Sequence, residues 1–520
     1  MSFTAHADDN VDAHNELLSG GHGSLNPAWI ETVKTAPIFT SLAGKEIDLD
    51  DELPGYQEFA LLGRQVEVLD PEAGRTTPHD VALDGRLFLN GNAPLSAFIC
   101  GVQGSGKSNT LSCMLENFLL SDPSIGELPA PLTGLVFHYD KHLQKPCEAA
   151  YLASRIPVTV LVAPSSFTRA TKLYPLIPGA NERLTIRPLR FRESDLDVTR
   201  MLTLMAVDLS DDKPPLYMEV VRKILRAMAN TATGFNYKSF KLLLKNVDLT
   251  PQQRSPLNLR LEILESFMAT NAAEKQVDLW SVTPGHLTII DLSDPFVDES
   301  TACSLFDICL HLFLDRPVTT GKVIAVDEAH KYMLGSASAQ RFTDTLLSTI
   351  RLQRHLGTRV VISTQEPTIS SKLLDLCSFT IVHRFSSPEW LSFLKAHIAA
   401  AEQDGRAGGG GLMTRVVGLD CGEAFVFAPS GLVAAKEVAV KPPAGGNSEG
   451  VREEMVADEM FWGKVRPTLQ DLTEKLGDMK VSGIAGCGKA KIEKIGVRYM
   501  RVRIRKRVTE DGGRSLLAMD

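Results

Sequence analysis

The sequence predicts an α/β fold with a largely parallel central sheet. Residues 95–100 form a short apolar run that leads into a glycine-rich loop and then into a segment with helical apolar spacing. Later apolar runs at 286–291, 323–326 and 359–364 end in a polar residue or lead directly into one, and helical patterns separate them. Short apolar runs that alternate with helices are typical of parallel strands buried on both faces.

The glycine-rich loop reads GVQGSGKS and contains Gly101, Gly104 and Gly106. Glycine adopts backbone conformations closed to other residues, so successive N–H groups can point at phosphate oxygens. Lys107 then reaches the β- and γ-phosphates and Ser108 offers its hydroxyl to Mg²⁺ at the positive end of the helix dipole. The loop therefore predicts an ATP and Mg²⁺ site. The residues expected to contact the nucleotide are Gly101, Val102, Gln103, Gly104, Ser105, Gly106, Lys107, Ser108 and Asn109.

A second match to this pattern, GIAGCGKA at residues 483–490, serves as an internal comparison. It ends in Ala490, which has no hydroxyl for a metal, and no apolar strand precedes it. We interpret it as a basic loop rather than a phosphate site.

The strand at 323–326 is apolar on both faces and ends in Asp327 and Glu328. Ligands of parallel sheets bind outside the carboxyl ends of the strands. We therefore expect Asp327 to hold Mg²⁺, through water, and Glu328 to polarise the attacking water as general base, with Lys107 completing the catalytic set. Gln365 follows the next strand and is our candidate for sensing the γ-phosphate or the water.

Arg351 and Arg354 lie at the end of a helix predicted over 337–356, which stops at Gly357. They can be solvated arginines favoured by the helix dipole, or one can reach the nucleotide of a neighbouring subunit as an arginine finger. The pattern leaves both alternatives open. Arg384, after the strand at 379–382, is a third candidate.

The run Gly134–Asp140 predicts another strand with polar residues at its carboxyl end. His138 and His142 flank Asp140. Two histidines at a strand end are more often loop residues than metal ligands, and we interpret them so.

Composition indicates a soluble globular protein of the cytoplasm or nucleus. The chain has 520 residues, 44% hydrophobic content and a net charge of −8, which argues against a protein that coats nucleic acid with its whole surface. Its eight cysteines form no CxxC pair, as expected of reduced thiols. No secretion signal and no apolar run of membrane-spanning length are present.

The chain divides into five predicted parts. They are a flexible tail over 1–35, a short β-rich segment over 36–84, an α/β core over 85–190 and 280–440, an inserted helical subdomain over 191–279, and a linker, helix and basic tail over 441–520. The insertion is predicted from runs with helical apolar spacing that proline and polar residues separate.

The basic tail contains an alternating stretch, VRYMRVRIRKRV. Residues 480–507 hold ten Lys or Arg and one acid, a net charge of 10 − 1 = +9. In a strand, Arg501, Arg503, Arg505 and Arg507 would share one face, spaced about 6.6 Å apart. Such a row can contact nucleic-acid phosphates, or it can belong to an edge strand whose arginines pair with acids of the body or of a neighbouring subunit. We favour the pairing interpretation.

Four motifs in order, GVQGSGKS, HLTIIDLSD, VIAVDEAH and RHLGTRVVISTQEP, resemble the HerA/FtsK superfamily of RecA-like P-loop motor ATPases, and most of all the HerA branch. The resemblance covers about residues 85–435, including the closing GEAFVF strand. It implies a RecA-like core and a hexameric ring that hydrolyses ATP at subunit interfaces and, in prokaryotic members, translocates double-stranded DNA. Lys107, Ser108, Asp327, Glu328 and Gln365 match the family motifs, and the trans arginine matches approximately.

We therefore expect a Mg²⁺-dependent ATPase that forms homo-oligomers, a hexamer by resemblance, and works as a DNA translocase or helicase-type motor. Duplex DNA would pass through the ring pore or contact the basic tail. The alternatives are a protein-remodelling or scaffold ATPase, and a nucleotide-dependent switch with slow turnover. All of them use the same hydrolytic residues, so the motifs leave them open.

Overall fold

The structure is a computed structural model. It describes residues 26–71, 74–76, 84–180, 182–204, 216–230, 235–271, 274, 276, 278–280, 283–403, 411–435 and 491–510. The second glycine-rich match at 483–490, the linker and the helix predicted between 441 and 476 lie outside these residues.

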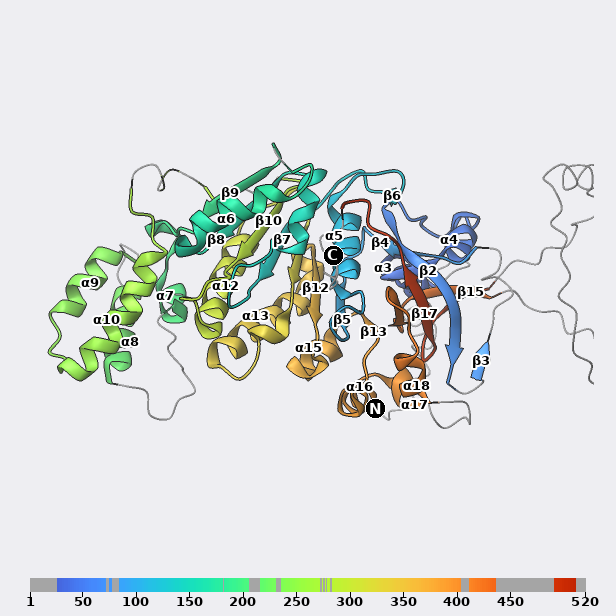
Figure 1. Ribbon diagram of the computed structural model, residues 1–520. Coiled ribbons are helices and arrows are strands. Elements are labelled where there is room, and N and C mark those ends of the chain that lie inside the picture. Colours follow the sequence, from blue (N-terminus) through green and yellow to red (C-terminus); the bar gives the residue numbers. More distant parts are fainter. Residues whose placement is uncertain are drawn as a thin grey trace, which may run out of the picture.

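One half of the sheet is parallel throughout (Figure 1). Its strands, in spatial order, are β9 (Leu184–Pro188), β8 (Val158–Val162), β10 (Leu287–Asp291), β7 (Thr133–His138), β11 (Lys322–Val326), β12 (Thr358–Thr364), β5 (Ser96–Cys100) and β13 (Phe379–His383). β12 therefore separates the strand before the glycine-rich loop from the strand before the acid pair. The predicted α/β fold with a largely parallel central sheet is confirmed.

The other half continues the same sheet with strands from both ends of the chain. In order they are β14 (Glu423–Phe427), β17 (Tyr499–Ile504), β2 (Phe59–Asp70), β4 (Arg86–Asn90), β1 (Ile38–Thr40), β15 (Leu432–Ala435) and β16 (Lys491–Lys494), antiparallel except between β1 and β15. The short β3 (Gly74–Thr76) and β6 (Gly126–Glu127) also pair with β2. The expectation of an edge strand in the basic tail is wrong, because β17 has a partner on each side.

Helices cover both faces of the parallel half. Each face of the sheet packs against its own hydrophobic cluster. Successive residues of β7 show this, since Leu135 and Phe137 belong to one cluster and Val136 belongs to the other. The first cluster includes α12 (Glu299–Leu314), α13 (Ala337–Arg351) and α15 (Ser371–Leu376). The second includes α5 (Lys107–Leu119), the 3₁₀ helix Glu148–Ser154 and α6 (Phe167–Leu173). The strands are thus buried on both sides, as their continuous apolar sequence predicts.

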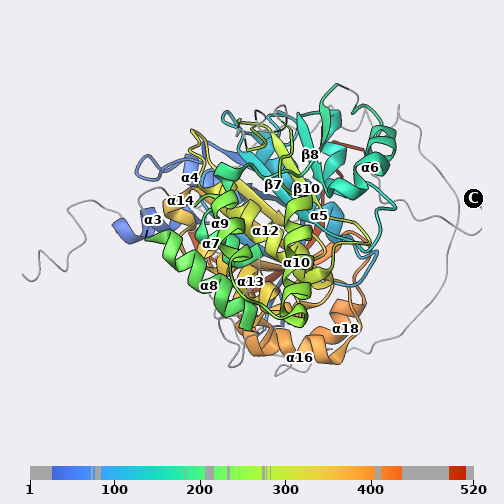
Figure 2. The ribbon, with the colours of Figure 1, turned by 90° about the vertical axis from the view of Figure 1, so that its left-hand side faces the viewer.

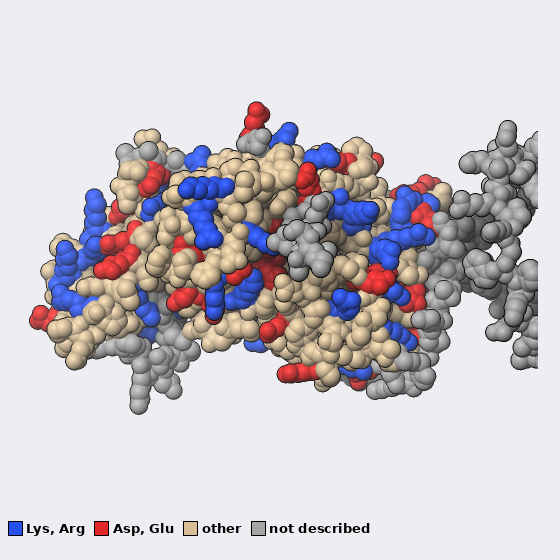
Figure 3. All heavy atoms as spheres, viewed as in Figure 1, with Lys and Arg blue, Asp and Glu red and all other residues tan. Residues whose placement is uncertain are grey.

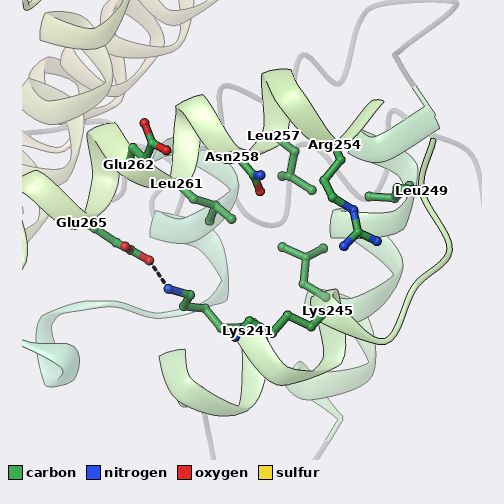
Figure 4. Close-up of a pocket in the computed structure, with 10 residues that line it drawn as sticks. Lys241, Lys245, Leu249, Arg254, Leu257, Asn258, Leu261, Glu262 and Glu265 are labelled. Atoms are coloured by element: carbon green, nitrogen blue, oxygen red, sulfur yellow. Dashed lines mark hydrogen bonds and ion pairs between the residues drawn. The ribbon is translucent and has the colours of Figure 1, made fainter. Parts of the chain in front are cut away.

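The α-helices whose bounds the structure describes between β9 and β10 extend one end of the molecule (Figures 1 and 2). They are α7 (Val198–Leu204), α8 (Leu216–Ala229), α9 (Tyr237–Lys245) and α10 (Pro251–Ser266). Their buried side chains continue the cluster under α12 and α13. A cavity of ≈ 230 Å³ between α9 and α10 has Leu244, Leu257 and Leu261 in its lining and the ion pair of Lys241 with Glu265 at one side (Figure 4).

Further described α-helices are α3 (Pro27–Thr35), α4 (Ser41–Asp48), α14 (Gln353–Leu356), α16 (Pro388–His397), α17 (Ala399–Gln403) and α18 (Leu412–Val417). The prediction of a flexible tail up to residue 35 is wrong for α3. Asn26 caps this helix, a proline occupies its first turn, and Val33 is fully buried in a cluster around Phe39. Among the helices of the described ranges, none combines the length and the apolar composition that a membrane span requires.

Candidate functional site

The glycine-rich loop joins β5 to α5 at the carboxyl edge of the parallel strands. Gly104 and Gly106 have φ angles of 73° and 112°, in the left-handed region that favours glycine. Gly101 has a φ of 151°, and a Cβ there would lie 2.7 Å from the Cβ of His383. Residues other than glycine would not adopt this loop conformation without strain. The conformation is compatible with the predicted phosphate cradle, which stays a prediction.

Lys107 is the first residue of α5, and its side chain is almost fully buried. Its Nζ donates a hydrogen bond of 3.0 Å to the carbonyl oxygen of Val102, inside the loop. Burial lowers the pKa of Lys107, and the charges of Glu328 and Asp327 oppose that effect. The acid pair, 220 residues later, therefore lies close enough to act on this ammonium group. An anionic phosphate would replace the loop carbonyl as a stronger partner.

Asp327 follows β11 directly and is buried. Its Oδ2 lies 3.2 Å from Nδ1 of His138, the last residue of β7. Its Oδ1 is buried and has no hydrogen-bond partner among the described residues. A buried carboxylate oxygen without a partner is costly, and a hard divalent cation is the ligand it suits. With the hydroxyl of Ser108 in the same cavity, this donor set fits the Mg²⁺ expected from the sequence.

Glu328 has a φ of 50°, and among the described residues it is the one non-glycine with positive φ. Such a conformation costs about 1–3 kcal/mol and is concentrated at functional sites. Its Oε2 accepts a hydrogen bond of 3.3 Å from Nε2 of Gln365, so the predicted base and the predicted sensor are in contact. The strain is thus located at the residue for which the sequence predicts a catalytic role.

His330 is a site residue that the sequence reasoning missed, although it stands inside the quoted motif VIAVDEAH. Its Nδ1 accepts the backbone N–H of Gln365 at 3.3 Å and lies 3.4 Å from Oε2 of Glu328. Burial lowers the pKa of His330, which keeps the ring neutral and Nδ1 free to accept. His330 therefore fixes Gln365 beside Glu328.

One cavity of ≈ 470 Å³ unites most of these groups. Predicted residues in its lining are Gln103, Gly104, Gly106, Lys107, Ser108, Asn109, Asp327 and Glu328. Val102 and Ser105 lie behind the loop, where the Ser105 hydroxyl donates 2.7 Å to the Val102 carbonyl. His138 also lines the cavity, so its interpretation as a loop residue is wrong: it ends β7 beside Asp327.

The structure does not bring Arg351 and Arg354 to the site of their own chain. Both are exposed and precede the amino end of β12, whereas the site lies at the carboxyl ends of β5, β11 and β12. Arg384 follows β13 on the site's edge of the sheet, and its carbonyl accepts the Val102 N–H at 3.0 Å. A role for Arg351 or Arg354 at a nucleotide therefore requires a second subunit.

The arginine row of the tail is paired inside the molecule. Arg501 and Arg503 lie 2.5 and 3.2 Å from the carboxylate of Glu423. Arg505 pairs with the fully buried Glu116 of α5 at 2.7 Å, and Arg507 pairs with Glu148 at 3.0 Å. The pairing interpretation is confirmed for these four arginines. It leaves the row poorly suited to contact phosphates.

The segment after β17 also supports the loop's helix. Glu116 accepts the backbone N–H groups of Val508 and Thr509 and the Thr509 hydroxyl. The side-chain amide of Asn109 donates to the Arg505 carbonyl at 3.2 Å. No local pattern near the loop predicts this contact, because its two sides lie almost 400 residues apart.

His383 ties the loop to the antiparallel half. Its Nδ1 lies 2.9 Å from the Glu423 carbonyl and its Nε2 lies 2.9 Å from the Thr110 hydroxyl. Complete burial lowers the pKa of His383 to about 4. The ring is therefore neutral at pH 7, with Nδ1 as the donor to Glu423 and Nε2 as the acceptor from Thr110.

A comparison with protein-family models and with curated proteins gives no match. Among solved structures, the chain is similar to VirB4 of Thermoanaerobacter pseudethanolicus, with 13% identity, a TM-score of 0.43 and coverage of 71% of this chain and 93% of that one. It is similar to the plasmid coupling protein TrwB in complex with ADP and Mg²⁺, with 11% identity, a TM-score of 0.35 and coverage of 64% and 82%. It is also similar to B204, the DNA-packaging ATPase from Sulfolobus Turreted Icosahedral Virus, with 11% identity, a TM-score of 0.28 and coverage of 65% and 93%.

Proposed function

We propose that this protein is a Mg²⁺-dependent ATPase that works as a ring-forming motor. One observation carries the ATPase proposal. The buried ammonium of Lys107, the unpartnered carboxylate oxygen of Asp327 and the strained Glu328 meet at one cavity whose glycine-rich wall is shaped for phosphates. These are the groups that triphosphate hydrolysis requires.

Binding begins at the loop, whose N–H groups and helix N-terminus receive the phosphates. Lys107 exchanges its bond to the Val102 carbonyl for the β- and γ-phosphate oxygens. Ser108 and the free Oδ1 of Asp327 would hold Mg²⁺, while His138 holds Oδ2. When bound, the cation supplies charge neutralisation on the phosphates. The buried carboxylate thereby obtains the partner it lacks.

Hydrolysis requires a base beside the γ-phosphate, and we assign it to Glu328. Its carboxylate takes a proton from the attacking water, and the hydrogen bond from Gln365 fixes its orientation. The neutral ring of His330 holds Gln365 through its backbone N–H. Contact between base and sensor gives Gln365 a route to couple the γ-phosphate to Glu328.

In the proposed ring, a neighbouring subunit would complete the nucleotide site. We propose that Arg351 or Arg354 stabilises the transition-state charge at an adjacent subunit, because both are exposed and lie at the opposite edge of the sheet. By the resemblance given above, the ring is a hexamer that translocates duplex DNA. Positive and negative side chains are interspersed over the face in Figure 3, so DNA contact would be local, at the pore.

The second candidate is a scaffold or remodelling ATPase that does not act on DNA. The internal pairing of the tail arginines favours it, because these cations are engaged with Glu423, Glu116 and Glu148. In that case the bound nucleotide would control only the assembly of the oligomer, and no DNA would be moved.

Two measurements distinguish the DNA motor from the scaffold ATPase. One is the rate of ATP hydrolysis with and without duplex DNA, and the other is the mass of the assembled protein in the presence of ATP. A DNA motor shows turnover that DNA stimulates severalfold, with less stimulation as salt rises. A scaffold shows DNA-independent turnover and an ATP-dependent change in mass. Absence of any turnover in the assembled protein contradicts the ATPase proposal itself.

A further inference from the structure

Three side chains of different chemistry meet at the wall of the nucleotide cavity. One donor atom each from His138, Cys147 and Asp327 lies within 4.8 Å of the other two. His138 ends β7, Asp327 follows the adjacent β11, and Cys147 precedes the 3₁₀ helix that starts at Glu148. An imidazole nitrogen, a thiol sulfur and a carboxylate oxygen are the donors that zinc sites use.

We propose that His138, Cys147 and Asp327 form a binding site for a thiophilic divalent cation of the Zn²⁺ type. Nδ1 of His138 and Oδ2 of Asp327 are 3.2 Å apart, close to the roughly 3.3 Å that two ligands of one tetrahedral Zn²⁺ would show. The sulfur needs to approach by no more than about 1 Å, since tetrahedral ligand pairs with sulfur lie roughly 3.6 Å apart. A water molecule supplies the fourth ligand.

The site has an entrance. His138 and Asp327 line the nucleotide cavity, as do Pro146 and Glu148 on either side of Cys147. The His138 side chain is 14% exposed, whereas Cys147 is buried. A cation can therefore enter from the cavity and bind His138 and Asp327 before it reaches the sulfur. On binding, the Cys147 thiol loses its proton to solvent and the sulfur bonds the metal as a thiolate.

The ligand types distinguish this site from the position assigned to Mg²⁺. Mg²⁺ requires oxygen ligands in octahedral geometry and does not favour a thiolate. Zn²⁺ would engage Oδ2 of Asp327 from the His138 side, while Mg²⁺ is assigned to Oδ1 from the nucleotide side. Because both depend on one carboxylate, Zn²⁺ would inhibit hydrolysis. That consequence, unlike the binding itself, rests on the proposed function.

Cobalt(II) gives the test, since its tetrahedral thiolate complexes absorb through a sulfur-to-metal charge-transfer band. We titrate Co²⁺ into full-length protein that has been treated with a chelator. The expected result is one Co²⁺ per chain with this band, displaced by Zn²⁺. Cys147→Ser should remove the band, and His138→Ala should weaken binding by at least about tenfold.

The matched control is Cys421→Ser, because Cys421 is exposed in the same cavity wall and its thiol contacts the Gly104 carbonyl at 3.3 Å. The band should persist in this variant. Loss of the band in Cys421→Ser, or no band in the parent protein, overturns the proposal. In the latter case the three side chains form only a hydrogen-bonded cluster.

X-ray absorption of the Zn²⁺-loaded parent protein needs no variant. It should show one sulfur at about 2.3 Å and nitrogen or oxygen ligands at about 2.0–2.2 Å, and a shell without sulfur contradicts the proposal. The ATPase assay is a separate arm: Zn²⁺ should reduce turnover and a chelator should restore it. If the protein hydrolyses no ATP under any condition, the proposed function is contradicted. The cobalt and X-ray absorption spectra would still show whether the metal site exists.

Discussion

Two sets of buried charges, one in the antiparallel half of the sheet and one at the carboxyl edge of the parallel half, differ in their partners. In the antiparallel half, Arg505 and Arg507 form ion pairs with Glu116 and Glu148. At the edge of the parallel half, and among the residues that the structure describes, Asp327 has one oxygen without a hydrogen-bond partner and Nζ of Lys107 donates to a loop carbonyl. The difference separates charges that complete the fold from charges that await a ligand.

Breaking the pair of Arg505 and Glu116 should give the largest effect. Arg505→Ala leaves a fully buried carboxylate without its cation, which costs about 3–5 kcal/mol. We expect the free energy of unfolding in urea to fall by that amount. Arg503→Ala is the control, because Arg503 is 61% exposed and its loss should cost under about 1 kcal/mol. Equal losses in both variants would contradict the view that the buried pair of Arg505 and Glu116 is what stabilises this part of the fold.

Removing the ammonium of Lys107 should affect binding and spare the fold. Lys107→Ala loses two charge-assisted hydrogen bonds to phosphate, so ATP affinity should drop by about a thousandfold. Without ATP, the variant's free energy of unfolding should lie within about 1 kcal/mol of the parent's, since among the described residues Nζ of Lys107 donates to the Val102 carbonyl alone. Calorimetry with ATP and urea unfolding without it measure the two quantities. A collapse of stability would assign Lys107 to the fold.

Acid should weaken the junction of the two halves through His383. Its pKa of about 4 in the folded protein lies below the ordinary value of 6.5, so the unfolded chain binds the proton more tightly. Its contribution to stability is therefore complete above pH 6.5, and about 3 kcal/mol is lost as the pH falls through 4. The stability difference between the parent and His383→Gln should shrink over that range. A constant difference between pH 7 and pH 4 would refute this.

Relieving the strain at Glu328 should give the smallest effect, with opposite signs for stability and activity. Glu328→Gly removes a left-handed non-glycine residue and should stabilise the protein by about 1 kcal/mol. Hydrolysis should stop, because the base is gone. Glu328→Gln should also stop hydrolysis without the gain in stability. A less stable glycine variant would mean that the conformation carries no strain.

The same contrast explains what the sequence could predict. The loop residues and the acid pair stand in short motifs next to apolar strands, and strand order then brings Lys107, Asp327 and Gln365 to one edge. The partners of the tail arginines were not predictable individually, because Glu116 and Arg505 meet only once β17 inserts between β14 and β2. The place of His138 beside Asp327 depends on the register of β7 against β11, which the local sequence pattern around His138 does not predict.

Retention of ATP by Glu328→Gln tests most directly whether the lysine loop and the acid pair share one triphosphate. This variant should hold about one ATP per chain in Mg²⁺ and release it when a chelator is added. Adding Lys107→Ala should abolish retention, and adding Asp327→Ala should abolish its dependence on Mg²⁺. Undiminished, Mg²⁺-dependent retention in both double variants would contradict the account.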